Sequence, residues 1–155
     1  MIERLGEALD TSCITLELNG KKKLDVIREL VSLLYDSGRI TDPDLVTTQI
    51  LERESLATTG IGGGIAIPHC LSEAASETVL AIGRKRSGVK FDAVDRRPVS
   101  LFFLMVGPPD AHNEHLRLLS RLARYLHDPG LKGGLLESAS PEEVLALFEA
   151  READR

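Results

Sequence analysis

The sequence predicts an α/β fold: a single three-layer domain in which a small mixed β-sheet carries helices on both faces. Two observations support this prediction. Segments whose apolar residues recur at helical spacing alternate along the chain with short apolar runs. One of these runs, residues 99–106, is almost entirely apolar, which is typical of a central strand that is covered on both faces.

The first strand and the first helix are predicted near the start of the chain. Residues 13–18 alternate in part between apolar and polar side chains, and Asn19-Gly20 is a turn signal that ends this strand. In residues 23–37 the apolar side chains recur at helical spacing. Gly38 suits the end of that helix, because glycine readily adopts the left-handed conformation common after helices.

A second helix and a second strand are predicted next. Either Thr41 or Asp42 can cap the helix, Pro43 suits its first turn, and Arg53 lies near its end. Its expected buried face consists of Leu45, Val46, Ile50 and Leu51. The short apolar run 65–67 then predicts a buried strand.

Two longer strands are predicted at 78–84 and 99–106, and the turn-rich segment 89–95 lies between them. The basic triplet Arg84-Lys85-Arg86 at the end of the first of these strands is expected to form a solvated turn. A helix over about 113–126 follows the second strand. Its expected core stripe consists of Leu116, Leu119, Leu122, Ala123 and Leu126.

The chain is predicted to end in two more helices. A short one is expected over about 131–137, after the breaking sequence Asp128-Pro129-Gly130. The last helix begins at Ser140, which can cap it, and Glu143 can complete a capping box. The charged residues 151–155 are expected to be a frayed tail.

Length and composition favour one domain over residues 1–155, with a core at about 5–150. The chain is 43% hydrophobic and 28% charged, and its net charge of −5 argues against a nucleic-acid partner. No apolar run approaches a membrane span, and no signal-peptide pattern is present, so no direct membrane insertion is expected. Cys13 and Cys70 form neither a disulfide framework nor a zinc pattern, so a reduced, cytoplasmic protein is expected.

The stretch from Arg53 to Cys70 is the candidate functional site. It holds four glycines within five residues, and these are Gly60, Gly62, Gly63 and Gly64. A loop of this kind exposes backbone N–H groups, which favour phosphate, and it is followed by a short strand and His69. The alternative interpretation is that the loop is only a turn and His69 only a loop residue. The pattern is neither a Walker loop nor a dinucleotide fingerprint.

The order and spacing of several motifs resemble the type-2 EIIA domain of the bacterial phosphoenolpyruvate-dependent phosphotransferase system. This group contains the fructose- and mannitol-type IIA domains and the nitrogen-regulatory IIA protein. The motifs are Arg53-Glu54, Thr59-Gly60-Ile61-Gly62, Gly64-Ile65-Ala66-Ile67-Pro68-His69, Phe91-Asp92-Ala93 with Asp95 and Pro98, and His115-Leu116 with Leu119.

The resemblance implies a role for three side chains. His69 is expected to be the phosphorylated nucleophile, His115 to donate a hydrogen bond to the phosphate, and Arg53 to stabilise the phosphate charge. The expected phosphate loop consists of Thr59, Gly60, Gly62, Gly63 and Gly64. No cofactor or metal is expected. The alternatives are that Arg53 is an ordinary surface charge and that His115 faces water at the start of a helix.

The implied function is that of a phosphocarrier. It accepts a phosphoryl group from HPr or its nitrogen-branch counterpart and passes it to an EIIB domain. The alternative is a regulatory IIA protein that binds target proteins according to the phosphorylation state of His69. The lack of an EIIB segment within the chain favours the regulatory branch. A third hypothesis, an unrelated α/β domain that binds a small molecule, requires the glycine loop to be purely structural.

Overall fold

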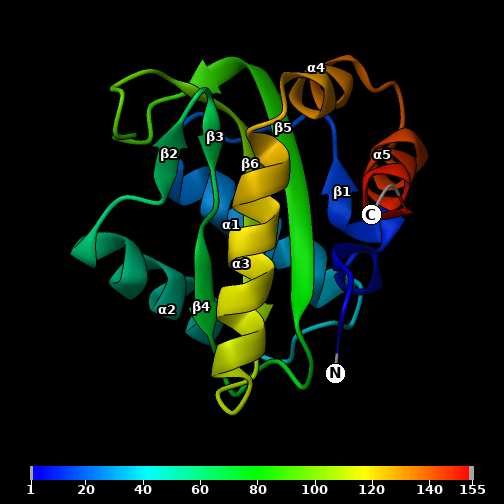
Figure 1. Ribbon diagram of the computed structural model, residues 1–155. Helices are drawn as coiled ribbons and strands as arrows, with labels where there is room; N and C mark the ends of the chain where they lie inside the picture. The colour runs from blue at the N-terminus through cyan, green and yellow to red at the C-terminus, as the bar shows by residue number, and fades with distance from the viewer. Residues whose placement is uncertain (1, 154–155) are drawn as a thin grey trace.

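The long apolar run becomes β6, Val99–Gly107, the central strand of a six-stranded mixed sheet in the computed structural model, which describes residues 2–153 (Figure 1). The strand order is β1-β5-β6-β3-β2, and β4 also pairs with β6. β6 runs antiparallel to β5 and parallel to both β3 and β4. The other strands are β1 (Ile14–Thr15), β2 (Gly60–Gly62), β3 (Ile65–Ala66), β4 (His69–Leu71) and β5 (Val79–Val89).

Side chains of β6 alternate between two hydrophobic cores, because successive strand residues point to opposite faces of a sheet. Phe102, Leu104 and Val106 belong to one core cluster. Leu101, Phe103 and Met105 belong to the other cluster. An apolar residue is therefore required at nearly every position of this strand, as the sequence indicates.

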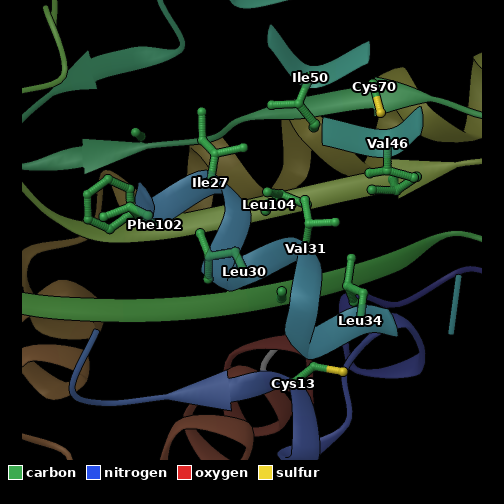
Figure 2. Packing of buried hydrophobic residues seen from close by; sticks show 14 of the residues in the cluster. Cys13, Ile27, Leu30, Val31, Leu34, Val46, Ile50, Cys70, Phe102 and Leu104 are labelled. Carbon is green, nitrogen blue, oxygen red and sulfur yellow. The ribbon is translucent and has the colours of Figure 1, made fainter. Parts of the chain in front are cut away.

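Helices α1 and α2 cover one face of the sheet. Helix α1 (Lys23–Asp36) and helix α2 (Pro43–Leu56) place their apolar residues against Phe102, Leu104 and Cys70, as Figure 2 shows. Asp42 caps α2 by accepting a hydrogen bond of 3.1 Å from the Leu45 N–H. Gly38 follows α1 with a φ of +77°, the left-handed conformation that glycine adopts without strain.

The opposite face is covered by α3 (His112–Leu126), which crosses in front of the sheet in Figure 1. Helices α4 (Pro129–Glu137) and α5 (Pro141–Ala153) continue this layer beside β1, with the 3-10 turn η1 (Leu5–Ala8). Cys13 of the 3-10 turn η2 (Thr11–Cys13) packs into the core under α1 and α2. The predicted α/β architecture, with a mixed sheet between two helical layers, is confirmed.

Two element predictions were wrong in extent. Most of the predicted strand 13–18 is absent: Asp10 caps the turn η2 by accepting the Ser12 N–H at 2.9 Å, so only β1 remains extended. Strand β5 continues beyond the predicted residue 84 to Val89, through an irregularity after Arg84. Gly88 has a φ of +80° in this irregular part.

The predicted core stripe of α3 was largely right: Leu122 and Leu126 are buried, and Leu119 and Ala123 are partly buried against the same core. Leu116 was wrong, because it is 52% exposed, and His115, Leu118 and Tyr125 are buried although they were not predicted to be. The fold instead turns a histidine inward, and this rotates Leu116 outward.

Arg84 was predicted to lie in a solvated turn, and this is also wrong. Its side chain is buried, and the guanidinium donates hydrogen bonds to the carbonyl groups of Leu16, Leu135, Leu136 and Ser138. Three of these carbonyls lie at the C-terminal end of α4. Arg84 thereby satisfies carbonyl groups that have no partner within the helix.

The expected frayed tail is ordered as far as Ala153, because α5 continues to that residue. Glu152 is buried and its carboxylate accepts hydrogen bonds from the Leu5 and Gly6 N–H groups at 2.8 and 2.9 Å. The end of α5 is therefore fixed against the N-terminal turn η1. Residues 154–155 of the expected tail lie outside the described residues.

Candidate functional site

The position of His69 follows from an interruption in one edge of the sheet. Ile65 pairs with Leu101 and His69 pairs with Met105, the same offset along β6, so β3 and β4 continue one line of pairing. Between them the Pro68 carbonyl accepts the Met105 N–H at 2.9 Å. Successive side chains of β4 point to opposite faces of the sheet.

Alternation along β4 separates His69 from its neighbour Cys70. Cys70 points into the core under α1 and α2, and His69 faces the side covered by α3. Burial, followed by the charge of Glu73, raises the pKa of the Cys70 thiol to about 12. Cys70 is therefore a packing residue and not a thiolate beside the site.

The imidazole of His69 is oriented by its own backbone. Its Nδ1 lies 2.7 Å from the Ile67 carbonyl oxygen, which can only accept, so Nδ1 carries the proton. Nε2 is then the ring nitrogen with the free lone pair. Burial lowers the pKa of His69, the Ile67 bond opposes this, and the charge of Arg53 lowers the pKa further. The neutral, nucleophilic form is thus favoured.

His115 lies beside His69. The centroids of the two rings are 5.6 Å apart and their planes are tilted by 55°. His115 is only 4% exposed, and neither ring nitrogen has a hydrogen-bond partner among residues 2–153. Burial, with the nearby His69 and His112, lowers its pKa to about 4. The hydrogen-bonding capacity of both ring nitrogens is therefore unused within the described residues.

Arg53 lies in the last turn of α2, where it is partly buried. Its Nη1 donates a hydrogen bond of 3.1 Å to the Ala57 carbonyl, which holds the side chain at the end of the helix. Its charge lowers the pKa of His69, so the guanidinium acts on the imidazole electrostatically. β4 and α3 therefore bring His69 and His115 side by side, and Arg53 at the end of α2 is near enough for its charge to lower the pKa of His69.

The predicted phosphate loop is arranged differently. The N–H groups of Thr59, Gly60 and Gly63 already donate to the side chains of Glu54, Thr58 and Asp95. In this conformation these donors are used within the protein. The loop is a hairpin of β2 and β3, at the opposite end of the sheet edge from β4 in Figure 1.

The glycines of this hairpin have steric reasons of their own. Gly62, Gly63 and Gly64 have φ values of +93°, +66° and +80°, which close the tight turn. A Cβ on Gly60 would lie 2.8 Å from Ala93. The atoms nearest to a Cβ on these glycines come from the 90–98 loop, from Ser100 and from Lys132.

Glu54 is a residue of this region to which the sequence analysis assigned no role. Its carboxylate is buried and accepts hydrogen bonds from the Thr59 N–H at 2.7 Å and the Thr59 hydroxyl at 2.5 Å. Lys23 of α1 forms an ion pair with it at 3.1 Å. The signal available in the sequence was its place beside Arg53 in a recognised motif. Glu54 fixes the chain between α2 and the hairpin.

A cavity of about 630 Å³ lies elsewhere, lined by the loop from Lys90 to Pro98. Neither His69 nor His115 lines it, and its walls carry no paired acid and base. Within residues 2–153, no group of three His, Cys, Asp or Glu side chains is arranged as a metal site. In the same range, no helix combines the length and apolar character needed to cross a bilayer.

The chain resembles known proteins in sequence and in fold. Residues 7–151 match the family described as phosphoenolpyruvate-dependent sugar phosphotransferase system, EIIA 2. The chain is 39% identical over 131 residues to the fructose-specific EIIA component of Haloferax volcanii, which covers 84% of this chain and 85% of that protein. It is 34% identical over 145 residues to the fructose-specific EIIABC component of Bacillus subtilis, and it spans 23% of that protein's length.

Solved structures share the fold. The nitrogen regulatory protein IIA-Ntr of Neisseria meningitidis is 35% identical, with a TM-score of 0.86 over 92% of this chain and 97% of that one. The IIA mannitol enzyme of Escherichia coli, solved in complex with phosphorylated IIB mannitol, is 26% identical. Its TM-score is 0.77 over 92% of this chain and 98% of that one.

Proposed function

Because this chain belongs to the EIIA 2 family of the phosphoenolpyruvate-dependent sugar phosphotransferase system, we propose that it is a phosphocarrier in which His69 bears the phosphoryl group. One observation carries this proposal. The Nδ1 of His69 donates to the Ile67 carbonyl, which leaves the Nε2 lone pair available beside the unpaired nitrogens of His115. A nucleophile and a hydrogen-bond donor of this kind are what phosphoryl transfer needs.

The proposed donor is the phosphohistidine of HPr or of its nitrogen-branch counterpart. The Nε2 lone pair of His69 forms a bond to phosphorus while the phosphorus–nitrogen bond of the donor breaks. The electron pair of that bond returns to the donor's ring nitrogen. The proton stays on Nδ1 of His69, held by the Ile67 carbonyl, so the step requires no proton transfer.

His115 and Arg53 are proposed to stabilise the phosphoryl oxygens. The charge of the transferred group is spread over these oxygens, so donors and cations near them lower the barrier. A neutral His115, favoured by its lowered pKa, still carries one N–H to donate. Arg53 adds a permanent positive charge and a planar set of donors.

The proposed acceptor is an EIIB domain, to which the phosphoryl group passes by the reverse step at Nε2. The E. coli IIA mannitol relative was solved with phosphorylated IIB mannitol, and this supports the assignment. Leu56 and Leu116 are 82% and 52% exposed, and they lie close in sequence to Arg53 and His115. Exposed apolar side chains beside a reactive group suit transient docking of a protein partner.

The test is phosphorylation from phosphoenolpyruvate with Enzyme I and HPr, followed by intact mass measurement. We expect one phosphoryl group, labile in acid and stable in base, and no such gain in His69→Gln. His127→Gln is the matched control, because His127 is an exposed histidine beyond the end of α3. A His69→Gln protein that still gains the group would overturn the assignment.

A regulatory role is the second candidate, supported by the 35% identity to the nitrogen regulatory protein of N. meningitidis. In this role the phosphorylation state of His69 decides which target proteins bind. Rates of phosphorylation by HPr and by nitrogen-branch HPr, measured side by side, separate the two branches. A faster reaction with the nitrogen-branch carrier, and retention of different cell proteins by the two phosphorylation states, would support regulation. Equal retention would oppose it.

A further inference from the structure

Thr78 is a buried polar residue that the proposed mechanism does not use. It immediately precedes β5, its exposed fraction is 0%, and its hydroxyl donates a hydrogen bond of 2.7 Å to Oε1 of Glu114. The other oxygen of Glu114 accepts the Ile2 N–H at 2.9 Å. Both oxygens of this carboxylate are thus tied to segments outside α3.

Glu114 lies in the first turn of α3, directly before His115. The N-cap residue of this helix, Ala111, offers no side-chain hydrogen bond. The first turn of a helix has N–H groups without intrahelical partners and frays when no cap holds it. The hydrogen bond from Thr78 to Glu114 therefore anchors a turn that lacks a side-chain cap.

The other side of the His115 ring meets the end of β6. A Cβ placed on Gly107 would lie 3.1 Å from Nδ1 of His115 and 3.3 Å from the Thr78 hydroxyl. The ring therefore packs almost directly on the backbone of the strand. Gly107 has no side chain that could adjust between the strand and the ring. A movement of the first turn of α3 would therefore change the position of the His115 ring.

We propose that Thr78, acting through Glu114, is a positioning residue that holds His115 against Gly107 and so sets its place beside His69. The inference rests on the proposed function, in which these two histidines handle the phosphoryl group. Transfer between fixed groups is sensitive to displacement, since about 1 Å of misplacement can cost about a hundred-fold in rate. Thr78 does not contact the reacting atoms, and its effect passes through the helix.

The test compares Thr78→Val with Thr78→Ser. Valine keeps the volume and removes the hydroxyl, whereas serine keeps the hydroxyl. Thr47→Val is the matched control, because the Thr47 hydroxyl bonds the Pro43 carbonyl within α2 at 2.8 Å and lies outside the site. The readouts are the imidazole NMR signals of His115 in the unphosphorylated protein and the initial rate of phosphorylation by phospho-HPr.

For Thr78→Val we expect shifted His115 signals and a rate reduced about ten-fold or more. Thr78→Ser is expected to restore the rate to within about three-fold and to return the signals. Gly107→Ala approaches the same ring from the strand and leaves the Thr78 hydroxyl in place, so it is expected to shift the same signals. Thr47→Val should leave both readouts unchanged.

Unshifted His115 signals in Thr78→Val would overturn the inference, whatever happens to the rate. A slow Thr78→Ser protein would overturn it too, because the hydroxyl would then not be the group that matters. Failure of the proposed function is distinguishable: the unsubstituted protein would then accept no phosphoryl group. The NMR comparison decides the position of His115 in that case as well, since it needs no phosphoryl transfer.

Discussion

The surroundings of His69 and His115 give the two imidazoles different properties. His69 is half-buried and keeps one nitrogen bonded to a backbone carbonyl, so its tautomer is fixed. His115 is almost fully buried and keeps both nitrogens unpaired. A buried polar group without a partner costs stability, and the phosphate-binding role that we propose for His115 would use these nitrogens.

The lowered pKa of His115 predicts a pH-dependent stability. The folded protein has a pKa of about 4 at this residue against 6.5 as the ordinary value. Between these values the unfolded chain binds a proton that the folded protein does not, so stability falls as the pH falls. From pH 7 to pH 5 we expect a loss of about 2 kcal/mol through His115.

Urea unfolding at these pH values measures the effect. In His115→Gln the same change of pH should cost less, because the group that titrates is gone. If the substituted and unsubstituted proteins lost equal amounts of stability, His115 would not be the group responsible.

The charge of Arg53 is expected to affect the rate of phosphoryl transfer to His69. Arg53→Gln removes the positive charge beside His69, and we expect the rate of phosphorylation by phospho-HPr to fall about ten-fold or more. Arg53→Lys should recover part of the rate, since it keeps the charge but not the planar set of donors. Arg28→Gln on the exposed side of α1 is the control. An unchanged rate in Arg53→Gln would show that the guanidinium takes no part.

At the scale of elements, buried charges connect segments that are far apart along the chain. Glu54 joins α2, α1 and the start of the glycine hairpin through Lys23 and Thr59. Arg84 joins β5 to the end of α4. Each provides hydrogen bonds to backbone groups that no regular ladder satisfies.

Glu54→Ala is expected to lower the free energy of unfolding by about 3 kcal/mol, because it leaves a buried N–H and hydroxyl of Thr59 without partners. Denaturant unfolding measures this. Glu52→Ala, on the exposed side of the same helix, should change stability by less than about 0.5 kcal/mol. Equal losses in the two proteins would contradict the role assigned to Glu54.

Arg84→Met is expected to cost about 2 to 3 kcal/mol, because the carbonyls at the end of α4 lose their donor. Hydrogen exchange should increase most in α4, and this local response separates the loss of the contact from a general weakening. Arg28→Met provides a comparison in which an exposed arginine is replaced in the same way. Faster exchange spread evenly over the sheet would argue against a specific role for Arg84.

At the scale of the whole molecule, one sheet separates two cores. Ile27 of α1 belongs to one core, and Phe148 of α5 belongs to the other. β6 contributes alternate side chains to both cores. Loss of either core would therefore expose one apolar face of the strand that supports the other core. The two helical layers are therefore expected to unfold together.

This predicts a single calorimetric transition for residues 1–155. Ile27→Val and Phe148→Leu each remove buried atoms from one core and should cost about 1 kcal/mol. Each is expected to lower the midpoint of the same transition by about 3 °C. Two transitions, one of which responds to only one substitution, would show two independent units.

The sequence determined the features that depend on local periodicity and turn chemistry. Helix α1, the cap at Asp42 and the apolar strand β6 all follow from neighbouring residues, and so does the α/β class. The motif around His69 also identified the family, because its residues are contiguous. Local patterns of this kind are visible without knowledge of what packs against them.

Only the tertiary structure decided which polar residues turn inward. His115, Glu54 and Arg84 are charged or titratable residues in patterns that usually face water, and all three are buried. For Arg84 and His115 the contacts are far along the chain: Arg84 bonds Ser138, and His115 meets His69. The free energy of burying such a group depends on whether a distant segment supplies its hydrogen bonds or lines its pocket, and that is settled only when the sheet and its helices assemble.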